Sequence, residues 1–418
     1  MNGSKTRALK EGGQGVIDYS QEENLGVQTG GTAQLLTRDC LDPWNYLEIS
    51  AAGDLRPCCN FHPLAQLGNE GNNIAALRNN DKFRSLRASL LSGNLEAPCQ
   101  RCHIRKTVPV DVLKRRLRRA WLPRGLTTAL EPLPITSIRI DINETCNLRC
   151  DYCAVSSPGY RGIEMSGTTF AKVAKLFDVV RPDATIHVNG HGETTYHPNW
   201  MQMSRAIIDF GYRPLIITNL AKNYSDEEID MLSTLYVIEV SLDSDDTDLM
   251  KRIRKAVRVD NVFKSLQRIR EAAHQHGRFS PLISFSVGIY EPSIWTLERF
   301  VDRLIEFGIQ RVTFWDLVVM PHQRLAKPLR QLDEQSLIRA RKILSNVRHK
   351  LEMAGVHYAF TGDLDLIASQ ASVAVQWWGK LGRAWTWKSR SYLIIFMQVL
   401  RVLRYRIFTK VRQKLTAA

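Results

Sequence analysis

The fold of this 418-residue chain is decided by the stretch Ile142-Asn143-Glu144-Thr145-Cys146-Asn147-Leu148-Arg149-Cys150-Asp151-Tyr152-Cys153. Its three cysteines have C-x3-C-x2-C spacing, and the strand-like run 137–142 leads directly into them. Three thiolates on so short a loop can face one point, but a closed tetrahedral zinc site needs four ligands. They suit a [4Fe–4S] cluster that is held by three cysteines and keeps one iron open. An open iron is a place where a molecule can be bound and reduced.

This spacing, with Tyr152 directly before the third cysteine, resembles the C-x3-C-x-aromatic-C signature of the radical S-adenosylmethionine (radical SAM) superfamily. The resemblance implies that Cys146, Cys150 and Cys153 are the catalytic cluster ligands and that Tyr152 borders the bound cofactor. The open iron would bind the amino and carboxyl groups of S-adenosylmethionine. One electron would then cleave its sulfonium to a 5′-deoxyadenosyl radical that abstracts a hydrogen atom. The alternative is a set of structural or zinc-binding cysteines.

Composition places the protein among ordinary globular chains. Hydrophobic residues make up 44% and charged residues 24%, and the length allows two or three domains. All eight cysteines lie between Cys40 and Cys153, and their short spacings indicate metal ligation in a reducing compartment. Residues 1–39 are polar and Gly-rich without an apolar signal segment, so we expect a flexible tail and a cytoplasmic protein.

Residues 40–106 contain the other group of cysteines. The alternating pattern over 42–49, the turn at 52–54 and the return over 55–59 predict a hairpin, and 74–91 reads as a helix. One closed metal site needs four ligands, and we expect Cys40, Cys58, Cys99 and Cys102 to provide them. Cys59 could replace Cys58 or be a small buried residue. Zinc and [4Fe–4S] both remain open on ligand count.

This unit resembles the SPASM or "twitch" auxiliary-cluster modules that accompany radical SAM enzymes. Cys40, Gly53 and Cys58 fit their opening pattern, as do Leu67-Gly68-Asn69 and the final C-x2-C. The resemblance implies an auxiliary [4Fe–4S] cluster that accepts electrons or stabilises the fold. Two departures stand out: the unit precedes the catalytic region, and its cysteines suffice for one cluster.

Residues 107–134 form a basic linker. The run Lys114-Arg115-Arg116-Leu117-Arg118-Arg119 lies in a predicted helix over 110–121. It is either a solvated face or a contact for an anionic substrate or membrane.

Residues 135–361 alternate six strands with six helices, which predicts an α/β fold with a parallel sheet. The expected strands are 137–142, 185–189, 215–218, 237–241, 282–287 and 311–317, and the expected helices are 168–180, 200–210, 226–235, 261–274, 294–307 and 334–354. Six units are too few for a closed eight-stranded barrel. A partial (βα)6 barrel is the radical SAM fold, so periodicity and motif agree.

Catalytic side chains should gather where the strands end, as in other βα barrels. Gly190-His191-Gly192-Glu193 resembles the family's Gly-Gly-Glu motif, which implies that Gly190, Gly192 and Glu193 receive the methionyl amino group. Ser241 and Asp243 resemble its ribose-binding Ser-x-Asp, and Arg254 is a candidate partner for the methionyl carboxylate.

Further polar residues at strand ends are candidates for substrate contact or proton transfer, with an ordinary structural role as the alternative. They are His187, His191, Glu291, Asp316 and His322.

The C-terminal region 362–418 has a different composition. From Leu366 onward it has no acidic residue, and basic residues alternate with Trp, Phe and Leu. Its apolar run is shorter than the ~20 residues that a spanning helix needs. We expect a basic amphipathic helical tail that contacts an anionic membrane surface, or alternatively packs on the barrel.

These features together predict a radical SAM enzyme that abstracts hydrogen from a substrate beneath an auxiliary cluster. We favour a saccharide-type or lipid-linked polar substrate, because no N-terminal peptide-recognition domain is visible. A peptide-modifying maturase and a non-catalytic iron–sulfur electron carrier or binding module are the alternatives. A reducing partner such as a flavodoxin or ferredoxin is implied, and nucleic acid is not an expected partner. The protein would be cytoplasmic, with peripheral contact at the inner face of the membrane.

Overall fold

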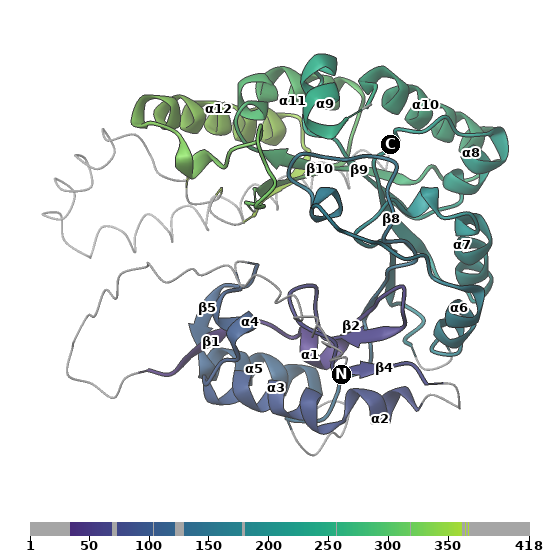
Figure 1. Ribbon diagram of the computed structural model, residues 1–418, viewed down its shortest axis with the longest axis vertical. Helices are drawn as coiled ribbons and strands as arrows, with labels where there is room; N and C mark the ends of the chain where they lie inside the picture. Colours follow the sequence, from purple (N-terminus) through teal and green to yellow (C-terminus); the bar gives the residue numbers. More distant parts are fainter. Residues whose placement is uncertain are drawn as a thin grey trace, which may run out of the picture.

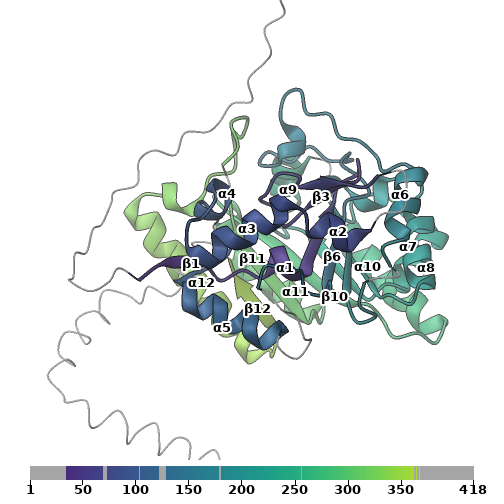
Figure 2. The same cartoon turned by 90° about the horizontal axis from the view of Figure 1, so that it is seen from below.

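The computed structural model describes residues 34–68, 73–102, 104–121, 129–177, 180–255, 257–317 and 319–361, together with Leu364 and Ile367. Figure 1 shows a curved sheet with helices along its outer side and a smaller unit at one end. Figure 2 shows the same molecule from below. Most of the predicted C-terminal tail lies outside the described residues. Within them, no helix is long and apolar enough to cross a membrane.

Seven parallel strands form the barrel part of the sheet, one more than the sequence predicted. Their spatial order follows the sequence: β6 Ser137–Ile140, β7 Thr185–Val188, β8 Pro214–Thr218, β9 Val237–Ser241, β10 Leu282–Ile289, β11 Arg311–Asp316 and β12 His357–Phe360. The partial barrel is confirmed, and β12 extends it by one strand.

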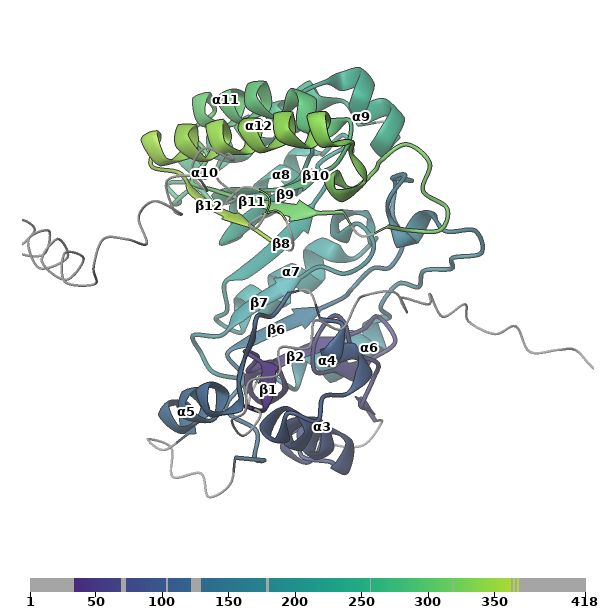
Figure 3. The same cartoon turned by 90° about the vertical axis from the view of Figure 1, so that its left-hand side faces the viewer.

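Helices between these strands cover the outer face, as Figure 3 shows from the side. They are α6 Gly167–Ala174, α7 Trp200–Asp209, α8 Asp226–Ser233, α9 Thr247–Arg254, α10 Val259–Gln275, α11 Leu297–Glu306 and α12 Glu334–Met353. Helix α8 begins at the predicted cap, where the Ser225 hydroxyl accepts the Glu228 N–H and the Glu228 carboxylate accepts the Ser225 N–H. Helix α9 was not predicted, because it is short and strongly charged.

The N-terminal unit consists of short elements. They are β1 Leu36–Arg38, α1 Asp42–Asn45, β2 Tyr46–Ile49, β3 Asp54–Arg56, β4 Ala65–Gln66, α2 Ile74–Arg78, α3 Asp81–Ser92, α4 Ala97–Gln100, β5 Thr107–Pro109 and α5 Val110–Trp121. Gly53 occupies the predicted turn with a φ of +86°, which glycine adopts readily. The expected helix over 74–91 is divided, because Asn80 caps the start of α3 by accepting the Phe83 N–H.

Two expectations about this unit are corrected. The strand expected over 42–49 begins with the helical turn α1, which carries a proline in its first turn. The flexible tail expected over 1–39 was predicted too long, because residues 36–38 form β1, which pairs with β5 in antiparallel register. Thr37 is buried there, and its hydroxyl donates to the Leu90 carbonyl.

The N-terminal unit and the barrel share one sheet. Strand β2 pairs in parallel with β6, and β3 and β4 follow it as antiparallel strands at the same edge. The apolar side chains of β2 and β6 lie in one continuous core, including Leu47, Ile49, Ile138 and Ile140. The two regions expected to be separate domains are therefore joined by main-chain hydrogen bonds and a shared core.

Candidate active site

The three cysteines of the deciding stretch gather in the loop after β6. Cys150 lies near both other thiols, and burial together with these neighbours raises its pKa to about 12. Burial likewise raises the pKa of Cys146 to about 11, although the Leu148 N–H donates to its sulfur over 3.4 Å. Thiols that resist ionisation in this way need a positive metal centre to become ligands, so the donor set fits an iron–sulfur cluster.

The Gly190–Gly192 segment after β7 packs directly against this cysteine loop. The Gly192 N–H donates to the Asn143 carbonyl over 3.0 Å, and the Glu193 N–H donates to the Thr145 carbonyl over 2.8 Å. A Cβ on Gly192 would stand 2.1 Å from the Thr145 oxygen. Only glycine permits this approach, so the predicted motif has a structural function at the cluster loop as well.

The Glu193 carboxylate is buried among four donors. Its Oε1 accepts the Thr195 N–H, the Thr195 hydroxyl at 2.8 Å and the Thr218 hydroxyl at 2.7 Å, and its Oε2 accepts the Asn219 N–H at 2.7 Å. The Asn219 side chain in turn donates to Asn147 in the cysteine loop. The network holds a negative charge close to Cys146. The expected contact between Glu193 and the methionyl amino group stays a prediction.

Asp243 and Arg254 form a buried ion pair. The guanidinium donates to both carboxylate oxygens, over 2.7 and 2.9 Å, and also to the Ser241 carbonyl. Asp243 further accepts the hydroxyls of Tyr152 at 2.6 Å and Tyr290 at 2.8 Å. Burial alone would raise the pKa of Asp243, but the adjacent guanidinium and these hydrogen bonds hold it below its usual range.

This pairing changes what the sequence suggested for the two residues. All of these hydrogen bonds to the Asp243 carboxylate come from groups of the protein itself. The Gly288 N–H donates one more. Arg254 is directed at Asp243 rather than left for a carboxylate ligand, and the Cys150 thiol lies 3.9 Å from the Arg254 carbonyl. The geometry therefore gives both residues a positioning function, while direct contacts with ribose or methionyl carboxylate stay predictions.

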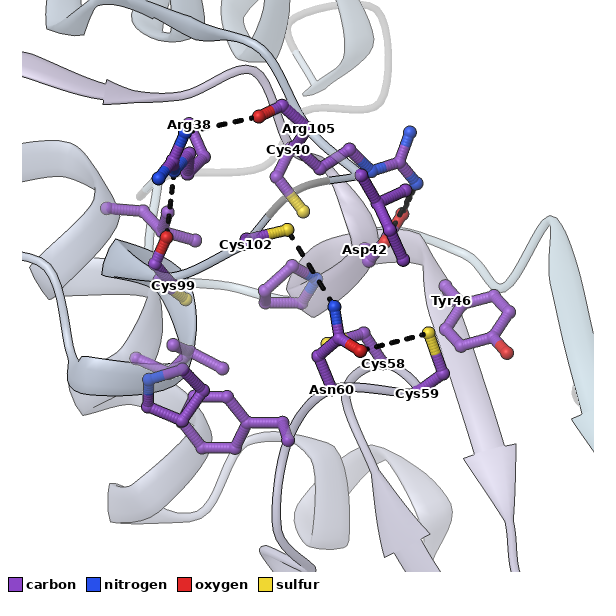
Figure 4. Close-up of a pocket in the computed structure, with 16 residues that line it drawn as sticks. Arg38, Cys40, Asp42, Tyr46, Cys58, Cys59, Asn60, Cys99, Cys102 and Arg105 are labelled. Carbon is purple, nitrogen blue, oxygen red and sulfur yellow. Dashed lines mark hydrogen bonds and ion pairs between the residues drawn. The ribbon is translucent and has the colours of Figure 1, made fainter. Parts of the chain in front are cut away.

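The other group of cysteines surrounds a second site. A cavity of about 200 Å³ is lined by all five cysteines of residues 40–102. Figure 4 shows the sulfurs of Cys40, Cys58, Cys99 and Cys102 around one space, while the Cys59 sulfur points toward Tyr46. Burial raises the pKa of Cys58 to about 12 and that of Cys99 to about 11. This arrangement supports the four ligands that the sequence led us to expect, with Cys58 rather than Cys59 among them.

Single-ion sites are absent from the described residues, where no three His, Cys, Asp or Glu side chains are close enough to hold one metal ion. Ligand count alone is compatible with either zinc or a four-iron cluster at the four cysteines.

Polar side chains on one face of the sheet form a run of contacts that starts at the lining of the auxiliary cavity and ends at the residue before Gly190. The Tyr46 hydroxyl lies 3.4 Å from the Glu48 carboxylate, and Glu48 lies 3.5 Å from Arg139 on the adjacent strand. The Arg139 Nε donates to the carbonyl of Asn189, the residue before Gly190. We call Tyr46, Glu48, Arg139 and His187 the polar wall.

Most of this wall was not predicted from the sequence. Tyr46 and Glu48 alternate with buried Leu47 and Ile49, which was a usable signal, but the side of the sheet they face depends on pairing with β6. His187 was a candidate, and it lies beside Arg139 in register. Burial and that guanidinium lower the pKa of His187 to about 4, so it is neutral at neutral pH.

The remaining candidates have partners within the protein. His191 approaches Asp141 to 3.4 Å, and the Ser157 hydroxyl lies 3.0 Å from His322 Nδ1. Asp316 accepts from Arg330 over 3.1 Å, and the Glu291 backbone bridges to Lys327. These contacts support structural roles, and none of the candidates is assigned a catalytic one.

Gly192→Ala should prevent assembly of the cluster at Cys146, Cys150 and Cys153, because the new Cβ displaces the Thr145 carbonyl. With two four-iron sites per chain, iron content should fall by about half. Chemical iron analysis and electron paramagnetic resonance would measure this. Gly167→Ala is the control, since its Cβ has no neighbour within 4 Å. Equal iron in both variants would contradict the packing argument.

Asp243→Asn should destabilise the chain by about 3–5 kcal/mol, because it leaves the Arg254 charge buried without its counterion. Urea unfolding followed by circular dichroism would measure the change. Asp248→Asn serves as the control, because Asp248 and its partner Lys251 are solvent-exposed and such a pair contributes less than about 1 kcal/mol. A loss at Asp243 no larger than that of the control would show that the pair does not hold the site.

Comparison with known proteins identifies both regions. A family model described as the radical SAM superfamily matches residues 140–313, and one described as an iron–sulfur cluster-binding domain, SPASM, matches residues 40–103. No curated protein sequence matches the chain.

Solved structures resemble the chain over part of its length. SuiB from Streptococcus suis bound to S-adenosylmethionine is 16% identical, with a TM-score of 0.44 over 60% of this chain and 63% of that one. A polyhistidine-tagged anSMEcpe with bound AdoMet is 13% identical, with a TM-score of 0.42 over 54% and 61%. This chain thus covers less than two thirds of either relative. By these two matches, the chain contains a radical SAM domain and, ahead of it, a SPASM-type iron–sulfur cluster-binding domain.

Proposed function

We propose that the enzyme oxidises a polar, hydroxylated substrate of the saccharide type that lies along the polar wall between the two cysteine sites. The observation that carries this proposal is the run of contacts from Tyr46, which lines the cavity of the auxiliary site, through Glu48 and Arg139 to Asn189. A substrate along this wall would have the hydrogen-abstracting site at one end and an electron acceptor at the other.

The charge of the wall supports an uncharged polar ligand. Glu48 is buried between Arg56 at 3.6 Å and Arg139 at 3.5 Å, and His187 is neutral. Within the wall the Glu48 carboxylate offsets the Arg139 guanidinium, so the wall itself offers several hydrogen-bond donors and acceptors with little net charge, and Arg56 beside it adds one positive charge. Such a surface suits hydroxyl groups, each of which both donates and accepts.

The chemistry balances as a two-electron oxidation. S-adenosylmethionine bound at the cluster supplies, after one-electron reduction, the radical that removes one hydrogen atom from a substrate C–H bond. The substrate must then lose one further electron and one proton to form a carbonyl from an alcohol. The cavity of Cys40, Cys58, Cys99 and Cys102 would hold the group that takes up this electron, and the proton would leave through the polar wall.

The decisive experiment follows deuterium. The anaerobically reconstituted, reduced enzyme would be incubated with S-adenosylmethionine and either C-deuterated saccharides, free and lipid-linked, or deuterated peptides. We expect deuterium in 5′-deoxyadenosine and a saccharide product that has lost two hydrogens, with neither formed by Cys150→Ala. Deuterium transfer from peptides alone would establish the maturase alternative. A chain with both clusters but no 5′-deoxyadenosine would favour an electron carrier or binding module.

Tyr46→Phe tests the wall itself. Loss of the hydroxyl should raise the KM for the saccharide about fivefold, the value of one hydrogen bond, while S-adenosylmethionine cleavage without substrate stays unchanged. Tyr358→Phe is the matched control, because the Tyr358 hydroxyl also donates to a glutamate, Glu352, at an exposed position. An unchanged KM in Tyr46→Phe would remove this residue from the substrate site.

We also infer that residues 362–418 contact an anionic membrane surface, which would suit a lipid-linked substrate. The support is their composition, basic and tryptophan-rich without acidic residues after Asp365. Liposome flotation of the full chain and of a chain truncated after Ser369 would test this, and equal flotation would contradict it.

A further inference from the structure

Helix α5 has one face in the core and one face in solvent. Val110, Leu113 and Leu117 are buried against the N-terminal unit, where Leu113 and Leu117 share a small apolar cluster with Trp44. Lys114, Arg115, Arg118 and Arg119 are exposed on the other side. Among the described residues no acidic side chain forms an ion pair with any of these four, which we call the α5 basic face. The surface therefore carries uncompensated positive charge.

A groove of about 390 Å³ runs along this face. Leu91, Leu117 and Ala129 give it an apolar lining, and three members of the basic face, Lys114, Arg115 and Arg118, also line it. Asp111 is the single acidic residue of the lining. Apolar contact surrounded by arginine and lysine is typical of a protein-binding site for an acidic partner.

Helix α5 is linked to the auxiliary site by contacts within the N-terminal unit. Arg116, in the middle of the same helix, pairs with Asp39, the residue before the proposed ligand Cys40. Helix α5 follows β5 directly, and β5 pairs with the strand that carries Arg38, which lines the cysteine cavity. Figures 1 and 2 show α5 beside α3 and β1, away from the helices α6, α7 and α8. A protein bound on this face would contact the N-terminal unit that contains the auxiliary cysteines, and not the helices α6, α7 and α8.

We propose that the α5 basic face is the docking surface for an acidic one-electron carrier protein that exchanges electrons with the auxiliary site. The proposal rests on the proposed function, in which each substrate oxidation leaves one electron at that site. That electron must leave before the next turnover, and one oxidised carrier molecule would take it up and become reduced by one electron. A folded protein partner is favoured because the groove has an apolar lining as well as charge.

The test uses an acidic flavodoxin as the probe and the full chain with both clusters. Stopped-flow absorbance would follow reduction of the clusters by flavodoxin hydroquinone at low ionic strength. A chain with Cys146, Cys150 and Cys153 replaced by alanine would report the auxiliary cluster alone. Neither measurement needs substrate or S-adenosylmethionine, so a failure of docking is distinguishable from a failure of the proposed oxidation.

The variant reverses three charges of the face: Lys114→Glu, Arg115→Glu and Arg118→Glu. The matched control is Lys175→Glu, Arg205→Glu and Lys264→Glu, which changes the net charge equally at exposed positions on the barrel side. The rate with flavodoxin should fall about tenfold or more in the first variant and little in the control, and salt should remove the difference. Reduced methyl viologen, a small cation, should lose no rate with either variant, because the added negative charge attracts it.

Three outcomes would overturn the proposal. Equal rates with flavodoxin for the two variants would show that the face does not steer the carrier. An equal loss with methyl viologen would show that the cluster itself is damaged. If the face variant loses binding to vesicles of phosphatidylserine while its flavodoxin rate is unchanged, the face binds a membrane instead.

Discussion

Strand β2 pairs in parallel with β6 through four residue pairs, and this pairing fixes how the two cysteine sites relate. The cysteine loop follows β6, whereas Cys58 and Cys59 follow β3, the neighbour of β2. Parallel and antiparallel hydrogen bonds thus hold both sites on one sheet, where a flexible linker would have left them free to move. The polar wall exists only because these strands are adjacent.

Local sequence was sufficient to predict most of the barrel elements and the cysteine groups, because their signals lie within a few residues. Helix α8 shows its cap, and the cysteine loop shows its spacing. Strand β12 was missed because its four residues, His357–Phe360, are half exposed and lack the long apolar run of a buried strand. The sharing of a sheet by two regions depends on contacts between residues far apart in the chain, which no local pattern encodes.

The candidate site shows the same limit in chemical terms. A carboxylate and a guanidinium near a strand end were expected to bind a ligand, and the structure adds that Asp243 and Arg254 also pair with each other, while the expected ligand contacts stay predictions. Sequence can state which charges are present, yet it does not state which of them are neutralised inside the protein. Conversely, Glu48 and Arg139 are 91 positions apart, so the contact between their side chains could be seen only in the structure.

The shared sheet also sets an order of events during synthesis. All proposed auxiliary ligands, from Cys40 to Cys102, leave the ribosome before any barrel strand has been made. The exposed edge of β2 must then wait for β6, and an unpaired strand edge is prone to aggregation. Early binding of a cluster in the cysteine cavity would stabilise the N-terminal unit until β6 has been made. Iron supply during translation would therefore influence the yield of folded protein, and not only its activity.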